Sequence, residues 1–167
     1  VLQQSMSFTN AGALDIFSDV STNRSSLKSS IEEPAGDYPL TQVAQIKPPV
    51  YEGTLLTSTH VYVSDDYAYV SYNTAGEAYL GAVDIIRISN PRNPRLTSRL
   101  YYTNADINSV QFDNGYVYIA GGVDSELSNL ATDNSFVGKI RAVNGRFDIS
   151  SGISYGFQAG QNATDLV

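Results

Sequence analysis

The feature that most constrains the fold of this chain is an internal repeat. The segment HVYVSDDYAYVSY, which starts at His60, aligns without a gap with SVQFDNGYVYIAG, which starts at Ser109. The offset is 109 − 60 = 49 residues. Apolar and aromatic positions coincide through both copies, so the chain repeats a structural unit of about fifty residues.

Each copy is predicted to form a β-hairpin. Apolar residues alternate on both sides of a central dipeptide, which is Asp65-Asp66 in the first copy and Asn114-Gly115 in the second. Asn-Gly is among the strongest signals for a two-residue hairpin turn, because such turns need positive φ angles. The second strand of each hairpin carries tyrosines on one face and aliphatic residues on the other. We therefore expect these strands to be covered on both sides.

Two further strands follow each hairpin. In the first copy, VDIIRIS is apolar on both faces and is expected to be interior, and the prolines of SNPRNP form a rigid corner after it. RLTSRLYYT alternates charged and apolar residues, which predicts a half-exposed outermost strand. In the second copy, VGKIRAV and ISYGFQ are the corresponding strands. Each unit thus holds four antiparallel strands that grade from buried to exposed.

Stacked four-stranded units of this length predict an all-β fold, a β-propeller built from four-stranded antiparallel blades. The propeller is expected over residues 38–167, with repeat units starting near residues 58, 107 and 162. A third copy begins at ATDLV, where Leu166 matches Val110 and Val61. YPLTQVAQIKPP fits an orphan outer strand of another blade. About two blades plus fragments do not close a ring, so we expect an incomplete portion of a longer protein.

The first unit, AYVSYNTAGEAYLGAVDIIRISNPRNPRLTSRL, resembles the LVIVD-repeat β-propellers. In that family a strand, a glycine-bearing turn, an aliphatic strand and a proline-rich corner recur. Arg87 stands where the family usually has an aspartate, and the second copy has NGRF in place of the prolines. The resemblance implies a bacterial extracytoplasmic or surface lipoprotein. It places the protein at the outer membrane or cell surface, with an anchoring cysteine upstream of Val1.

Residues 1–37 are predicted to be an irregular N-terminal tail or linker, because the segment is rich in serine and has no sustained hydrophobic period. A segment with so few apolar residues hardly repays its ordering entropy by burial within its own chain. We expect it to lie against a partner protein, with Leu14, Ile16 and Phe17 as anchors.

Composition excludes several functional classes. A net charge of −7 disfavours nucleic acid as a partner. The chain has no cysteine and one histidine, so thiolate and multi-histidine metal sites are excluded, and no cofactor is expected. No apolar run is long enough for a transmembrane segment. No nucleophile elbow, phosphate-binding loop or zinc-binding motif is present, which indicates that the chain is not an enzyme.

The remaining candidate residues favour structural roles. His60 lies in a strand and is expected to pack rather than to catalyse. The acidic loop with Asp124, Glu126 and Asp133 lacks a calcium-loop pattern and is expected to be solvated. Strand alternation and the proline corner are expected to separate Arg87, Arg92, Arg95 and Arg99 on the surface. Contact of these arginines with phosphate or carbohydrate stays an open alternative. Core packing is favoured over sugar stacking for the repeated tyrosines, namely Tyr67, Tyr69, Tyr116 and Tyr118.

Two functional classes remain after these exclusions. The favoured hypothesis is a non-catalytic binding or scaffold module of an exported, membrane-tethered protein, which contacts a partner protein through its loops and tail. The alternatives are a propeller hydrolase or lyase whose catalytic residues lie on blades outside this sequence, and a glycan-binding propeller. Fold alone does not choose between them.

Overall fold

The chain folds as an all-β structure. The computed structural model describes residues 14–16, 42–76 and 78–167, and within these ranges the only helix is one 3-10 turn, η1 (Ser125–Leu127). This confirms the predicted fold class. The strands are β1 (Leu14–Ile16), β2 (Val50–Tyr51), β3 (Thr54–Leu55), β4 (Thr57–Ser64), β5 (Tyr67–Asn73), β6 (Gly81–Arg87), β7 (Arg95–Tyr102), β8 (Ala105–Asp113), β9 (Tyr116–Val123), β10 (Ser135–Val143), β11 (Arg146–Asp148) and β12 (Ser154–Gln158).

The first repeat forms one antiparallel sheet with the strand order β1-β7-β6-β5-β4. We call β4–β7 the first blade and β4 its inner strand. The interior position predicted for VDIIRIS is confirmed, because every residue of β6 except Arg87 is buried. The proline corner is also present, since the Asn93 N–H donates to the Asn90 carbonyl at 2.9 Å. Strand β1 lies at the other edge of this sheet and falls inside the segment predicted to be a tail.

The second repeat forms the second blade, with the order β8-β9-β10 and β8 as its inner strand. The fourth strand position is divided between two short strands, because β11 pairs with one end of β10 and β12 with the other. The division follows from NGRF, which stands in the second copy where the first copy has its prolines. Asn144 and Gly145 have φ angles of 52° and 70°, so the chain turns back at once into β11.

Both inner hairpins carry a β-bulge at the same repeat position. The pairing of β4 with β5 shifts between Ser58 and His60, and the pairing of β8 with β9 shifts between Ile107 and Ser109. The extra residues are Thr59 and Asn108, which again differ by 49 positions. A bulge re-aims the side chain of its extra residue out of the regular alternation. The repeat therefore extends to a backbone irregularity that periodicity alone does not reveal.

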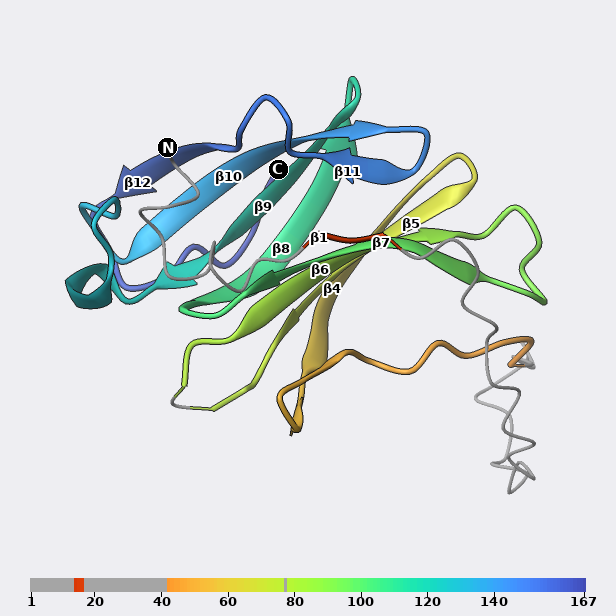
Figure 1. The fold of residues 1–167 in the computed structure, drawn as a ribbon, viewed down its shortest axis with the longest axis horizontal. Coiled ribbons are helices and arrows are strands. Elements are labelled where there is room, and N and C mark those ends of the chain that lie inside the picture. Colours follow the sequence, from red (N-terminus) through yellow and green to blue (C-terminus); the bar gives the residue numbers. More distant parts are fainter. Residues whose placement is uncertain (1–13, 17–41, 77) are drawn as a thin grey trace.

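The two blades stack face to face (Figure 1), and β8 lies against β4, β5 and β6. The largest core cluster lies between the sheets. Tyr69 of β5 stacks on Phe112 of β8 with ring centroids 4.7 Å apart and an angle of 8° between the planes. This contact confirms the expected packing role of Tyr69. Tyr116 and Tyr118 are only half-buried, and Lys139 lies over both rings.

The predicted gradient from buried hairpin to exposed fourth strand is wrong in the first blade. Strand β4 is largely exposed, whereas Ser98 to Tyr102 of β7 are all buried. A bulge near Thr97 breaks the expected alternation, and Arg99 is buried because it pairs with Asp84. Residues 42–49 of the expected orphan outer strand form no strand, and residues 38–41 lie outside the described ranges.

Candidate functional site: a polar seam between the inner strands and a buried ion pair

The predicted tail anchors are only partly within the described residues. Leu14 and Ile16 lie in β1, which pairs antiparallel with β7 in the register Leu14 to Leu100 and Ile16 to Ser98. Phe17 lies outside the described residues. The pairing brings this part of the chain to the outer edge of the first blade, away from the inner strands.

The bulged residues link each repeat to the next. The Thr59 hydroxyl donates to the Ile107 carbonyl at 2.7 Å, and the Asn108 amide donates to the Ala163 carbonyl at 3.0 Å. Because Leu166 aligns with Val110, Ala163 of the third copy is the equivalent of Ile107. The same donor position therefore contacts the same acceptor position twice. We call this line of contacts along the inner strands the polar seam.

One residue further along, three equivalent side chains lie in a row within hydrogen-bond distance of one another. His60, Ser109 and Asp165 occupy the same position in the three copies. Ser109 Oγ lies 3.0 Å from His60 Nδ1 and donates to Asp165 Oδ1 at 3.0 Å. The backbone N–H of Val110 also donates to His60 Nδ1, at 3.2 Å. An Nδ1 that accepts an N–H bond is unprotonated, so the neutral imidazole of His60 carries its proton on Nε2.

Side-chain amides extend the polar seam at one end. Asn73 donates to Asn108 at 3.0 Å, and Asn108 donates to Asn162 at 2.5 Å. Gln111 reaches the Leu166 carbonyl at the other end. The amides thus connect β5, β8 and the start of the third copy.

The polar seam brings together residue types that occur in catalytic triads but arranges them differently. In a triad the histidine lies between the nucleophile and the acid, whereas here Ser109 lies between His60 and Asp165. Ser109 is 1% exposed, so no substrate reaches its hydroxyl. The Leu166 N–H and then the Ser109 hydroxyl hold the pKa of Asp165 below its ordinary value. The arrangement ties repeats together and leaves no exposed nucleophile.

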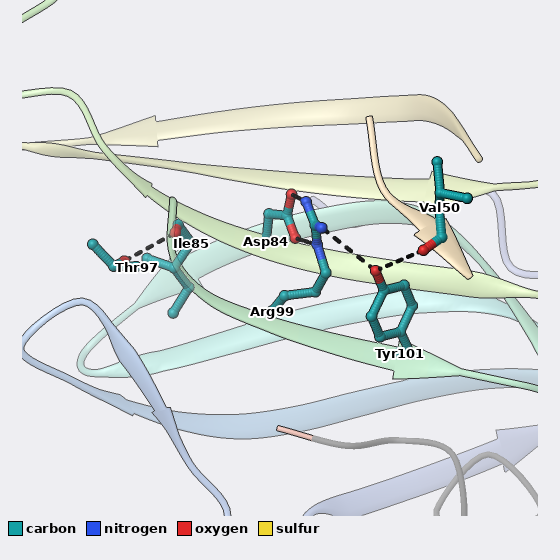
Figure 2. Close-up of polar contacts among 6 residues, drawn as sticks. All are labelled: Val50, Asp84, Ile85, Thr97, Arg99 and Tyr101. Atoms are coloured by element: carbon teal, nitrogen blue, oxygen red, sulfur yellow. Dashed lines mark hydrogen bonds and ion pairs between the residues drawn. The ribbon is translucent and has the colours of Figure 1, made fainter. Parts of the chain in front are cut away.

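A second polar site, which sequence reasoning missed, lies inside the first blade (Figure 2). Arg99 of β7 and Asp84 of β6 form a two-pronged ion pair, with Nε to Oδ1 at 2.6 Å and Nη2 to Oδ2 at 2.7 Å. Asp84 is fully buried. Arg99 also donates to the Tyr101 hydroxyl at 3.4 Å, which donates to the Val50 carbonyl at 3.3 Å. The pair therefore connects the blade to the segment before β4.

The ion pair shifts the pKa of its neighbours. Burial lowers the pKa of Arg99, but the hydrogen bonds and the charge of Asp84 outweigh burial and hold it above the ordinary value. Burial raises the pKa of Tyr72, and the nearby Asp84 carboxylate raises it further. The sequence signal for this pair is an aspartate inside the apolar run VDII, since a buried carboxylate needs a partner. The identity of the partner follows only from the strand register, which places Asp84 opposite Arg99.

Asp106 is a carboxyl group in an unusual environment at the start of β8. Burial raises its pKa to about 6, although its Oδ1 accepts a hydrogen bond from the Leu80 N–H at 3.2 Å. A carboxyl with a raised pKa suits acid–base chemistry, but structural sites show such shifts as well.

The other candidates do not form a site. Among the described residues, no group of three or more metal-ligating side chains lies close enough to hold a metal ion. Asp124 caps the 3-10 turn by accepting from the Glu126 N–H at 3.1 Å, which agrees with a loop role for the acidic segment. No helix in the described ranges has the length and hydropathy of a membrane span.

Comparison with known proteins identifies the first repeat. Residues 57–101, which span β4 to β7 except for the last residue of β7, match the family model of the LVIVD repeat. LVIVD repeats form β-propellers, in agreement with the two stacked antiparallel sheets. No curated protein matches the chain. No solved structure matches it either.

Proposed function

From the premise that residues 57–101 carry an LVIVD repeat, we propose that this chain is a non-catalytic binding or scaffold module of an exported bacterial protein. Its loops and N-terminal segment contact a partner protein. The module is tethered at the outer membrane or cell surface. Both the export and the tether are extended to this chain from its resemblance to LVIVD-repeat lipoproteins.

The polar seam is the observation that carries the proposal. His60, Ser109 and Asp165 hold equivalent places in three repeats and lie in contact, with Ser109 donating a hydrogen bond to Asp165. The side chains of the inner strands that could act in catalysis therefore contact the next repeat instead. A module of this kind presents its surface to a partner, and its polar interior keeps the blades in register.

The loop before β10 supports a binding role. It is longer than the corresponding loop of the first blade, and it exposes 70% of Leu127 on η1. Binding residues concentrate on loops that a rigid scaffold positions. Exposed aliphatic side chains on such loops fit the apolar centre of a protein partner better than a nucleic acid.

The proposal is tested on the whole protein in the cells that naturally make it. The measurement is the amount of partner protein that is recovered with this protein after chemical crosslinking in those cells. Deletion of residues 1–37 and the substitution Leu127→Asp are each expected to lower this amount several-fold. Val143→Asp is the matched control, because Val143 is also exposed, at 42%, but lies at the end of strand β10. Undiminished crosslinking in both loop and tail variants would contradict the proposal. Protease accessibility on intact cells tests the surface location.

One observation favours the alternative, a propeller hydrolase or lyase. Burial raises the pKa of Asp106 to about 6, which makes this carboxyl a candidate general acid. The purified whole protein is therefore assayed for glycoside and ester hydrolysis, with Asp106→Asn as the comparison. Turnover by the natural protein that is lost in the variant would establish the enzyme in place of the scaffold.

A further inference from the structure

The outer edge of the first blade is covered by a strand that is distant in the chain. Strand β1 pairs with the outer side of β7, so the sheet has the order β1-β7-β6-β5-β4 (Figure 1). The four strands of the blade follow one another directly, whereas Ile16 at the end of β1 precedes Thr57 at the start of β4 by 57 − 16 = 41 positions. Strand β1 is therefore a fifth strand that is added to a complete four-stranded blade.

The pairing of β1 with β7 is short and isolated. Residues 14–16 pair with residues 98–100, although β7 is eight residues long. Of the described elements, β7 is the one with which β1 makes its main contacts. Asp15 stands opposite Arg99 in the register, and opposite charges at facing positions of antiparallel strands stabilise the pairing. Nothing in these contacts requires that the two strands belong to the same molecule.

The connection from β1 to the blade is long enough to reach a neighbouring molecule. Ile46 packs on the cluster of Ala68, Ile86 and Leu96, and it follows Ile16 by 46 − 16 = 30 positions. A chain of that length spans up to about 100 Å. A folded domain of this size is only about 40 Å across. Strand β1 can therefore reach the β7 edge of another copy as well as its own.

The described strands offer one acceptor edge of this kind in each chain. In the second blade the fourth strand position is divided between β11 and β12, so no outer strand as long as β7 is present there. One donor strand and one acceptor edge favour a reciprocal exchange, which closes as a two-fold symmetric dimer. After the first strand has exchanged, the second meets its acceptor at a high effective concentration.

We propose that the outer edge of β7 is the docking site for β1 of a second copy of this chain, and that two copies exchange their β1 strands. The exchanged strand keeps the register in which Asp15 stands opposite Arg99. This inference rests on the proposed function and specifies it, because the partner of the N-terminal segment is then another copy of the same protein. Tethering at a membrane surface raises the local concentration of copies and favours exchange over pairing within one chain.

The test places the photocrosslinker p-benzoylphenylalanine at residue 14 of the whole protein, in the cells that naturally make it. A second, tagged copy that lacks residues 1–37 is made in the same cells and has no β1 of its own. The expected product joins the two copies through a peptide that contains residues 95–102. The matched control carries the photocrosslinker at Val143, which is 42% exposed at the end of β10, and its yield of joined copies is expected to be several-fold lower.

The possible products separate this inference from the proposed function. A product between residue 14 and a different protein would overturn the exchange but would support a module that binds another partner. Crosslinks from residue 14 that stay within one chain would overturn the exchange and would also contradict a partner contact by the N-terminal segment.

A charge substitution in the donor copy tests the register. Asp15→Arg places a like charge opposite Arg99, so the yield of joined copies is expected to fall several-fold. Asp66→Arg makes the same change of charge at an exposed hairpin turn of the first blade and is expected to leave the yield unchanged. Equal yields from the two variants would show that β1 does not dock beside Arg99 of another copy, and they would overturn the proposal.

Discussion

At the scale of single residues, the described part of the chain has one buried ion pair and one exposed ion pair. Arg99 and Asp84 meet with almost no solvent contact, whereas Arg141 and Asp148 are 3.7 Å apart with side chains 52% and 30% exposed. Breaking a buried pair leaves one charge uncompensated in a medium of low dielectric constant. Water screens the exposed pair, so its loss matters little.

The matched substitutions Arg99→Met and Arg141→Met measure this contrast. Arg99→Met is expected to lower the free energy of unfolding by about 3–5 kcal/mol, because it leaves Asp84 charged and buried. Arg141→Met is expected to cost at most about 1 kcal/mol. Urea unfolding followed by circular dichroism measures both. Adding Asp84→Leu to Arg99→Met should recover stability, because it removes the uncompensated charge. A double variant with a lower free energy of unfolding than Arg99→Met would contradict this explanation.

Asp106 makes a prediction about pH at the same scale. Its pKa rises from 3.8 to about 6 on folding, so between these values the native state binds more protons than the unfolded chain. Its effect on stability is therefore most favourable below pH 3.8 and is lost as the pH rises through about 6. The substitution Asp106→Asn should remove this contribution. The free energy of unfolding of the natural protein minus that of the variant should therefore fall as the pH rises from 3.8 to about 6. A difference that does not change over this range would show that Asp106 titrates normally.

At the scale of elements, the β10–β11 hairpin is shaped by one glycine. Gly145 has a φ of 70°, and a Cβ at this position would lie 2.1 Å from the ring of Tyr67. The Gly145 carbonyl also accepts the Thr97 hydroxyl at 2.5 Å. The turn that divides the fourth strand position is thus packed directly against the first blade.

Two alanine substitutions separate the backbone effect from this contact. Gly152 also has a positive φ, 81°, but nothing lies within 4 Å of its Cβ position. Gly152→Ala should therefore destabilise by about 1 kcal/mol, the cost of the left-handed conformation alone. Gly145→Ala should cost about 2 kcal/mol more, because the Tyr67 ring must move. Thermal melting of both variants measures the difference, and equal losses would contradict the packing argument.

At the scale of the whole molecule, burial follows from how blades stack. Val61 and Val110 are the same repeat position in two strands of similar sequence. Val110→Ala is expected to cost about 2 kcal/mol in the 167-residue chain, from two lost carbon atoms and the cavity that remains. Val61→Ala in the same chain should change stability by less than about 0.5 kcal/mol. Similar losses at both positions in denaturant unfolding would show that stacking does not determine them.

The sequence by itself determined the strands, their turns and the repeat. These depend on local periodicity and on turn residues, such as Asn114-Gly115, whose φ angles are both positive as predicted. It also located the proline corner and the residues equivalent to His60, because gapless alignment needs no knowledge of contacts. The LVIVD match at residues 57–101 agrees with the resemblance found from the same strands and corner.

Only the tertiary structure decided which faces are buried and which polar groups meet. The buried β7 strand depends on the bulge near Thr97 and on the register that sets Arg99 opposite Asp84. The polar seam depends on the bulged Thr59 and Asn108 reaching the next repeat. Val61 differs from Val110 only through its neighbours. Burial and hydrogen bonding between strands are properties of pairs of distant residues, and no local pattern in one strand records the strand that covers it.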